Sequence, residues 1–349
     1  MAVQKITTKD FTVFENINID IDAGINLIIG ENGVGKTHLL KLIYAVGLIR
    51  TEYPVAAITA ITDGSWGLQI TSKVTDIDSI SSGNISEISA TGRPKIIALP
   101  VEMEPDAKEI YVKKNYPHLT GAIYEAVVES DIPYDAVFIP CKDMLSHSKG
   151  LPEMADKHGA NMPFDRFYLD IIKLARRWEL KTVPDIAKSI VPTLEKVIEG
   201  KVVLENDTFY VQKNDGRVIP FSNEAEGIKK FGLLWLLLMN ESITKDTVLL
   251  WDEPENSISP KYIPVLVEAM LELQRQGVQI IATTHSYNFM KYFSVKKEKA
   301  DKVAFFSLIK DTDGKVRKCE REDDYDLLEH NSIIEANTKL LEDEIERVL

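Results

Sequence analysis

Short apolar runs alternate with helical segments along this chain of 349 residues. Ile25–Ile29, Val248–Trp251 and Val278–Thr283 are mostly apolar at successive positions, as strands buried on both faces are. Helices are predicted from Thr37 to about Val46 and from Pro260 to Gln276. This order predicts an α/β fold in which helices cover the faces of a parallel sheet.

Other predicted strands are shorter or more polar and end at turns such as Ala23-Gly24 and Asn206-Asp207. These strands are Phe11–Phe14, Ile17–Ile21, Leu68–Val74, Lys95–Leu99, Ala136–Ile139, Val202–Glu205, Thr208–Gln212, Arg217–Phe221, Val303–Ile309 and Val316–Cys319. Asp78–Asn84 and Ser89–Arg93 are rich in Ser and Gly and are predicted to be loops.

Between residues 144 and 200 the pattern becomes helical. Apolar side chains at helical spacing predict a stripe that faces a core: Phe164, Phe167, Tyr168, Ile171, Ile172, Ala175 and Trp178. Pro184 and Pro192 are each expected near a helix start. We therefore expect one composite unit over residues 1–349. In it, an α/β core with a β lobe (1–143 and 201–349) carries a small helical lobe (144–200).

Composition narrows the function classes. The formal net charge is −13, so the chain as a whole repels a polyanion. A protein that binds nucleic acid permanently usually carries a surplus of basic residues instead. One local basic cluster is better interpreted as a solvated helix end or loop: Lys291, Lys296, Lys297 and Lys299. The sequence contains no apolar run of membrane-spanning length and no signal pattern, and Cys141 and Cys319 form no disulfide framework. We expect a cytoplasmic protein with no membrane partner.

Gly30–Thr37 matches the phosphate-loop pattern G-x-x-x-x-G-K-[ST] and lies between a predicted strand and a predicted helix. In such a loop, backbone N–H groups surround the phosphates, the lysine reaches the β- and γ-phosphates, and the hydroxyl binds Mg²⁺. We expect Lys36 to face solvent until a nucleotide arrives. The predicted cofactors are ATP and Mg²⁺. The predicted nucleotide-binding residues of this segment are Gly30, Glu31, Asn32, Gly33, Val34, Gly35, Lys36, Thr37 and His38.

Two further segments place polar side chains at the carboxyl ends of buried strands, where α/β sheets bind ligands. Asp252 and Glu253 follow the first of these strands, and His285 follows the second. Asp252 is expected to hold Mg²⁺ together with Thr37. Glu253 is expected to orient the attacking water, and His285 to donate to the γ-phosphate or to position that water.

The order of the phosphate loop, the Asp252-Glu253 pair and His285 resembles that in the heads of ABC/SMC-type ATPases. The chain is most similar to the stand-alone AAA-like ATPases and to the ATPase half of OLD proteins. The markers are Gly30–Thr37, Val137–Ser146, Glu224–Gly232, Asp252–Pro260 and His285. The resemblance implies a P-loop ATPase head with a mainly parallel core sheet, an antiparallel β lobe and a small helical lobe. It also implies two heads that join in antiparallel contact with ATP at their interface.

The chain departs from this family in two places. The signature segment is Ala225-Glu226-Gly227, without the usual serine, although Ser222 lies nearby and the Gly227 backbone can still contact a partner's γ-phosphate. The sequence has no glutamine where the family's Q-loop is expected. We expect Asp143 to take the role of that residue as a ligand of the metal ion.

Other candidates are weaker. Cys141, His147 and His158 lack the paired spacing of a zinc site. Asp311–Gly314 is predicted to be a hairpin turn rather than a metal motif, and we expect no room for the TOPRIM nuclease domain of OLD proteins. Ile333–Leu349 is predicted to be an amphipathic acidic helix used for packing or partner binding.

The sequence thus predicts an ATPase that dimerises on ATP and switches a separate effector, such as a nuclease. By analogy with the family, its setting is DNA repair or antiphage defence, with nucleic acid reached through the complex. Two alternatives stay open: a non-hydrolysing scaffold that assembles on ATP, and a nucleotide-binding subunit of a transporter.

Overall fold

A computed structural model describes residues 3–9, 11–50, 57–61, 86–88, 95–99, 123–130, 134–158 and 166–348. The predicted strand Leu68–Val74, both predicted Ser/Gly-rich loops and Phe164 lie outside these residues. None of the helices in the described ranges is long and apolar enough to cross a membrane.

A six-stranded sheet forms the centre of the molecule, in the order β15-β14-β3-β13-β12-β8. Its strands are β3 (Ile25–Ile29), β8 (Asp135–Ile139), β12 (Thr247–Asp252), β13 (Gln279–Thr283), β14 (Val303–Lys310) and β15 (Val316–Glu322). Every neighbouring pair is parallel except β14 and β15, which form a hairpin. The mainly parallel sheet predicted from the sequence is confirmed, as is the turn at Asp311–Gly314.

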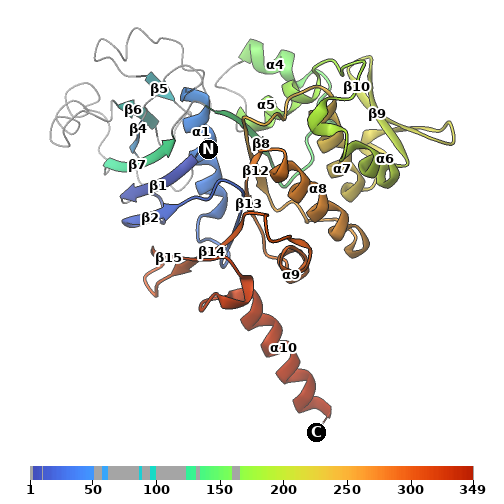
Figure 1. Cartoon of the computed structure of the whole chain (residues 1–349). Coiled ribbons are helices and arrows are strands. Elements are labelled where there is room, and N and C mark those ends of the chain that lie inside the picture. Colours follow the sequence, from blue (N-terminus) through green and yellow to red (C-terminus); the bar gives the residue numbers. More distant parts are fainter. Residues whose placement is uncertain are drawn as a thin grey trace.

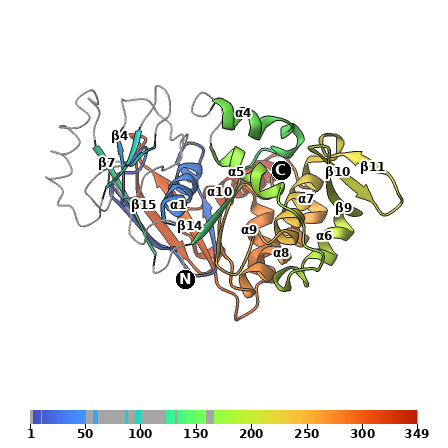
Figure 2. The same ribbon diagram turned by 90° about the horizontal axis from the view of Figure 1, so that it is seen from above.

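Helices pack on both faces of this sheet. On one face α1 (Lys36–Arg50) shares a core with Ile28, Leu250 and Ile281. The opposite face packs against several helices around Leu27, Trp251 and Ala282. These helices are α5 (Arg166–Ala175), α6 (Val191–Ile198), α7 (Glu226–Met239), α8 (Ile263–Arg275) and α9 (Tyr287–Lys296). Figure 2 shows α1 separated from α7, α8 and α9 by the strands.

Two antiparallel sheets flank the core (Figure 1). The larger has the order β2-β1-β7-β4-β6-β5, and the smaller has the order β11-β10-β9. Their strands are β1 (Val3–Lys9), β2 (Ile17–Asp20), β4 (Ala57–Ile61), β5 (Ser86–Ile88), β6 (Lys95–Leu99), β7 (Ile123–Ser130), β9 (Gly200–Glu205), β10 (Thr208–Lys213) and β11 (Val218–Pro220). The fold is therefore α/β with a mainly parallel central sheet and separate antiparallel sheets.

The remaining helices lie between or beyond these layers. α4 (Leu151–His158) precedes α5 in the predicted helical region. α10 (Ser332–Val348) extends away from the rest of the molecule, as Figure 1 shows. Two of the four lysines in the basic cluster near the end of α9 pair with acids: Lys291 contacts Asp326, and Lys296 contacts Glu268. This agrees with its interpretation as a solvated helix end.

Three local predictions are wrong. Phe11–Phe14 is a tight turn, closed by a bridge between its two phenylalanines, and the strand lies earlier, at β1. The turn requires a left-handed residue, Thr12, at φ +55°. Trp178 is 93% exposed because α5 ends at Ala175, so the apolar stripe does not reach it. α1 continues past Val46 to Arg50.

Candidate active site

The phosphate loop connects β3 to α1. Its backbone depends on left-handed glycines, which adopt positive φ without a Cβ clash. Gly35 has φ +86°, and a Cβ at this position would stand 2.7 Å from the Phe14 ring. The loop residues Glu31 and Asn32 are exposed, whereas Val34 is fully buried, and His38 is partly exposed on α1. The loop tip is therefore open to solvent while its base is packed.

Lys36 is buried, which overturns the expectation that it faces solvent. Its ammonium donates to the carbonyl oxygens of Gly30 and Glu31, each at 2.9 Å. Burial lowers the pKa of Lys36 to about 8, against the opposing effect of the nearby carboxylates of Glu253 and Asp252. The loop carbonyls thus hold the lysine in place within the site.

Thr37 and Asp252 come together from α1 and β12. The Thr37 hydroxyl lies 3.1 Å from each carboxylate oxygen of Asp252. Thr283, at the end of β13, donates its hydroxyl to Asp252 Oδ1 at 2.6 Å and so orients the carboxylate. Hydroxyl and carboxylate oxygens are the ligands that Mg²⁺ prefers, so this donor set fits that ion.

Glu253 follows directly, in a left-handed conformation at φ +47°. Its N–H donates to the Thr283 carbonyl at 3.2 Å, and its carbonyl accepts from Lys230 at 2.7 Å. Glu253 Oε1 lies 3.8 Å from His285 Nε2. The structure therefore brings these two predicted residues side by side.

Electrostatics keeps Glu253 ionised and His285 neutral near pH 7. Burial opposes ionisation of Glu253, but hydrogen bonds from Asn256 and Cys141 hold its pKa below the usual range, together with the charges of Lys230 and of His285 when that ring is protonated. Burial, followed by the positive charge of Lys36, lowers the pKa of His285. A carboxylate acceptor and a neutral imidazole thus face one another.

Glu255 was not singled out from the sequence. It is buried, accepts the Thr284 hydroxyl at 2.5 Å, and its burial raises the pKa of its carboxyl. It ties the loop after β12 to the segment that carries His285. The sequence shows only a further acidic residue close to Asp252 and Glu253. This pattern does not distinguish a buried glutamate that anchors the loop from a glutamate exposed in a turn.

The signature segment begins α7. Ala225 is the N-cap and has no side-chain acceptor for the first N–H groups of the helix. Glu226 pairs with Lys229 at 2.6 Å, and a Cβ on Gly227 would stand 2.8 Å from the Ser257 carbonyl oxygen. Ser222 contacts its neighbour Asn223, at 3.4 Å. Contact between this segment and a partner's phosphate loop stays a prediction.

Asp143 has structural partners. Its carboxylate accepts from the Leu145 N–H at 2.9 Å and from the Ser146 hydroxyl, and it lies 3.4 Å from Lys229. The residue of this segment that contacts Glu253 is Cys141, two positions earlier. The metal-binding role of Asp143 stays a prediction that none of these contacts supports.

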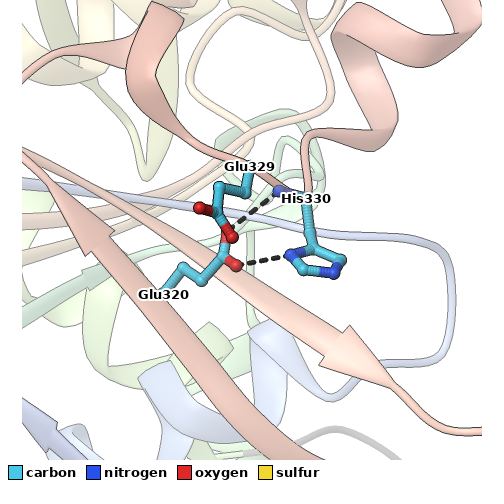
Figure 3. Close-up of side chains that lie close together, drawn as sticks. All are labelled: Glu320, Glu329 and His330. Atoms are coloured by element: carbon cyan, nitrogen blue, oxygen red, sulfur yellow. Dashed lines mark hydrogen bonds and ion pairs between the residues drawn. The ribbon is translucent and has the colours of Figure 1, made fainter.

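A separate cluster lies between β15 and the start of α10 (Figure 3). Potential ligand atoms of Glu320, Glu329 and His330 are all within 4.8 Å of one another. The backbone N–H of His330 donates to Glu320 Oε2 at 2.9 Å, and Lys318 Nζ lies 3.1 Å from Glu320 Oε1. A protein cation therefore already neutralises Glu320, and the cluster anchors the base of α10.

Two protein-family models match parts of this chain. A model of the family described as "AAA domain, putative AbiEii toxin, Type IV TA system" matches residues 126–291. A second model, described as "AAA domain", matches residues 5–46. The first range contains Asp252, Glu253 and His285, and the second contains the phosphate loop.

Curated relatives match over short segments. The DNA replication and repair protein RecF of Nitrosococcus oceani is 31% identical over 77 residues, which are 22% of this chain and 21% of RecF. RecF of Salmonella typhi is 38% identical over 47 residues, 14% of this chain and 13% of RecF. The chain therefore spans about a fifth or less of the length of these relatives.

Solved structures cover more of the chain at low identity. The SMC head domain from Thermotoga maritima is 14% identical, with a TM-score of 0.41, over 92% of this chain and 99% of its own. An Smc head with an extended coiled coil, bound to the C-terminal domain of ScpA and derived from Pyrococcus furiosus, is 13% identical. Its TM-score is 0.48, over 98% of this chain and 99% of its own. The site geometry and the two AAA-domain models together support a P-loop nucleotide-binding site in this chain.

Proposed function

We propose that this chain binds ATP with Mg²⁺ and hydrolyses the bond between the β- and γ-phosphates. The observation that carries the proposal is the convergence of Thr37 with Asp252 and of Glu253 with His285, beside the phosphate loop. These side chains come from separate segments and meet at the carboxyl edge of the parallel sheet, where α/β folds bind ligands.

Each residue has a distinct part in the proposed reaction. Backbone N–H groups of the loop hold the phosphates, and Lys36 exchanges its contacts with the loop carbonyls for phosphate oxygens. Thr37 and Asp252 would hold Mg²⁺, which would supply positive charge to the phosphates. The Glu253 carboxylate accepts a hydrogen bond from the attacking water, and His285 donates to the γ-phosphate or to that water. This arrangement acts by positioning and charge rather than by covalent chemistry.

We further propose that ATP joins two copies of the chain and that hydrolysis switches a separate effector protein. The signature segment at the start of α7 would complete the site of a partner head. RecF is a DNA replication and repair protein, and the matching family is described through a toxin of a type IV TA system. An effector that acts in DNA repair or in defence agrees with both of these descriptions. A nuclease that carries the nucleic-acid contact is one such effector.

One observation favours a second function, an ATP-dependent scaffold without turnover. Ala225 offers no hydroxyl at the N-cap of α7, so a partner's γ-phosphate would receive only backbone contacts. Loss of one such donor would slow hydrolysis more than it would weaken binding.

Steady-state phosphate release by the wild type and by Glu253→Gln separates the two functions. The ATPase predicts release from the wild type and a fall of about 10³-fold or more in the variant, as for other single parts of phosphoryl-transfer sites. Normal ATP binding with no phosphate release from either protein would support the scaffold. Failure of the wild type to bind ATP would contradict both.

A further inference from the structure

The side chain of Cys141 lies beside Glu253. Cys141 comes two residues after the end of β8, at the carboxyl edge of the sheet. Its Sγ lies 3.4 Å from Glu253 Oε2, with the thiol as donor. An S–H group is a weak donor, and its effect depends on being held in place. Here a third side chain holds it.

That side chain is Asn256, in the loop after β12. Its amide donates to Cys141 Sγ at 3.1 Å and to Glu253 Oε2 at 3.0 Å. Two donors therefore converge on one oxygen of the Glu253 carboxylate. The other oxygen, Oε1, is the one that lies 3.8 Å from His285.

We propose that Cys141 is a positioning residue for Glu253. The thiol and the Asn256 amide hold Oε2, so Oε1 keeps a fixed direction toward His285 and the attacking water. Because a reacting group must keep its geometry to act, loss of one anchor lowers the rate rather than the affinity for ATP. This inference rests on the proposed function, in which Glu253 orients water.

The place of Cys141 in the chain agrees with this role. It follows Ile139-Pro140 at the carboxyl end of β8, the strand that pairs with β12. The carboxylate of Asp143, in the same segment, contacts Ser146 and Lys229. The polar contact from this segment to Glu253 is therefore made by the thiol.

Cys141→Ala and Cys141→Ser test the inference, with Cys319→Ala as the matched control in the hairpin strand β15. Loss of one hydrogen bond predicts that Cys141→Ala lowers kcat about five- to tenfold and leaves KM for ATP and the melting temperature unchanged. Cys141→Ser keeps a donor and is expected to recover most of the rate. Cys319→Ala is expected to match the wild type.

Single-turnover hydrolysis in the Glu253→Gln background gives the second readout. If Cys141 acts through Glu253, Cys141→Ala causes no further loss there, because the group that it positions is already gone. A full additional loss in that background, a fall in ATP affinity, or wild-type kcat in Cys141→Ala would overturn the inference. If Glu253→Gln itself turns over at the wild-type rate, the proposed function fails instead.

Discussion

One buried cation, Lys36, lies close to two carboxylates in the site. The Lys36 ammonium is buried near Asp252 and Glu253, and loop carbonyls take its hydrogen bonds. Bringing phosphates into the loop replaces neutral acceptors with charged ones, which form stronger hydrogen bonds. Lys36 thus lies at the loop, where it can exchange its carbonyl contacts for phosphate oxygens.

Lys36→Ala is expected to abolish ATP binding. The ammonium is the charged donor that reaches the phosphates, and its removal leaves the carbonyls of Gly30 and Glu31 without this partner. Because Lys36 is buried, we also expect a modest loss of stability, of about 1–3 kcal/mol. Calorimetric titration with ATP and thermal unfolding measure the two effects, and unchanged ATP affinity would contradict the phosphate-loop assignment.

ATP affinity is expected to fall as the pH rises above about 8, the pKa of free Lys36. Phosphate anions raise that pKa in the complex, so binding above pH 8 requires proton uptake, whereas at pH 7 the lysine is already charged. Titrations at pH 7 and pH 9, in buffers of different ionisation enthalpy, measure both affinity and proton uptake. Equal affinity at the two pH values would show that Lys36 does not titrate in this range.

At the scale of elements, apolar runs buried on both faces were the most predictable. Ile25–Ile29 was predicted with both ends correct, and Val248–Trp251 became β12 with one residue added at each end. The sequence does not predict β1, because Val3–Lys9 is largely polar. The apolar residues Phe11 and Phe14 instead predict a strand where the structure has a turn. Burial by tertiary packing, rather than local pattern, decided that region.

The same limit applies to the site. The sequence motifs predicted the convergence of Asp252, Glu253 and His285, because strand ends share one edge of a parallel sheet. They could not predict the burial of Lys36 or the contact of Cys141 with Glu253, which depend on loop conformation and on pairing of β8 with β12. The contact of Cys141 with Glu253 joins positions 112 residues apart, whereas the contacts of Lys36 with Gly30 and Glu31 depend on the local loop conformation.

Gly227→Ala tests the packing of α7 against the loop after β12. A Cβ at this position would stand 2.8 Å from the Ser257 carbonyl oxygen and 3.1 Å from Ile258 Cα, both backbone atoms that cannot turn aside. Overpacking of this kind costs about 1–3 kcal/mol. Denaturant unfolding is expected to show that loss in Gly227→Ala, whereas the exposed Ser222→Ala is expected to unfold like the wild type. Equal stability of all three proteins would contradict the close contact.

At the scale of the whole molecule, α10 leaves large apolar side chains in solvent. Ile333 at its base is buried, but Leu340, Leu341 and Ile345 are each more than half exposed. Its role in packing or partner binding stays a prediction, as does the division into a core and a helical lobe.

Glu253→Gln is expected to form a stable dimer with ATP and Mg²⁺. With hydrolysis blocked, ATP held between two heads stabilises the dimer by mass action. Light scattering with ATP, with ADP and without nucleotide measures the mass, and Lys36→Ala is the control that is expected to stay monomeric. A monomer at saturating ATP would contradict the proposed dimer.

The isolated chain is expected to show no nuclease activity on plasmid, linear or single-stranded DNA with Mg²⁺ or Mn²⁺. Phosphodiester cleavage by metal ions needs carboxylates that converge on one or two of them. Asp311 and Asp313 instead pair with Arg317, at 2.7 and 2.6 Å, within the β14–β15 hairpin.

Two further observations support this expectation. The net charge of −13 opposes tight binding of DNA by the chain alone. The cluster in Figure 3 contains Glu320, which Lys318 and His330 already contact. Cleavage assays with the wild type, Asp313→Ala and Glu320→Gln test both places. Cleavage that Asp313→Ala abolishes would assign it to the hairpin, and cleavage that Glu320→Gln abolishes would assign it to the cluster. Either result would mean that this chain, rather than a separate effector, cuts the DNA.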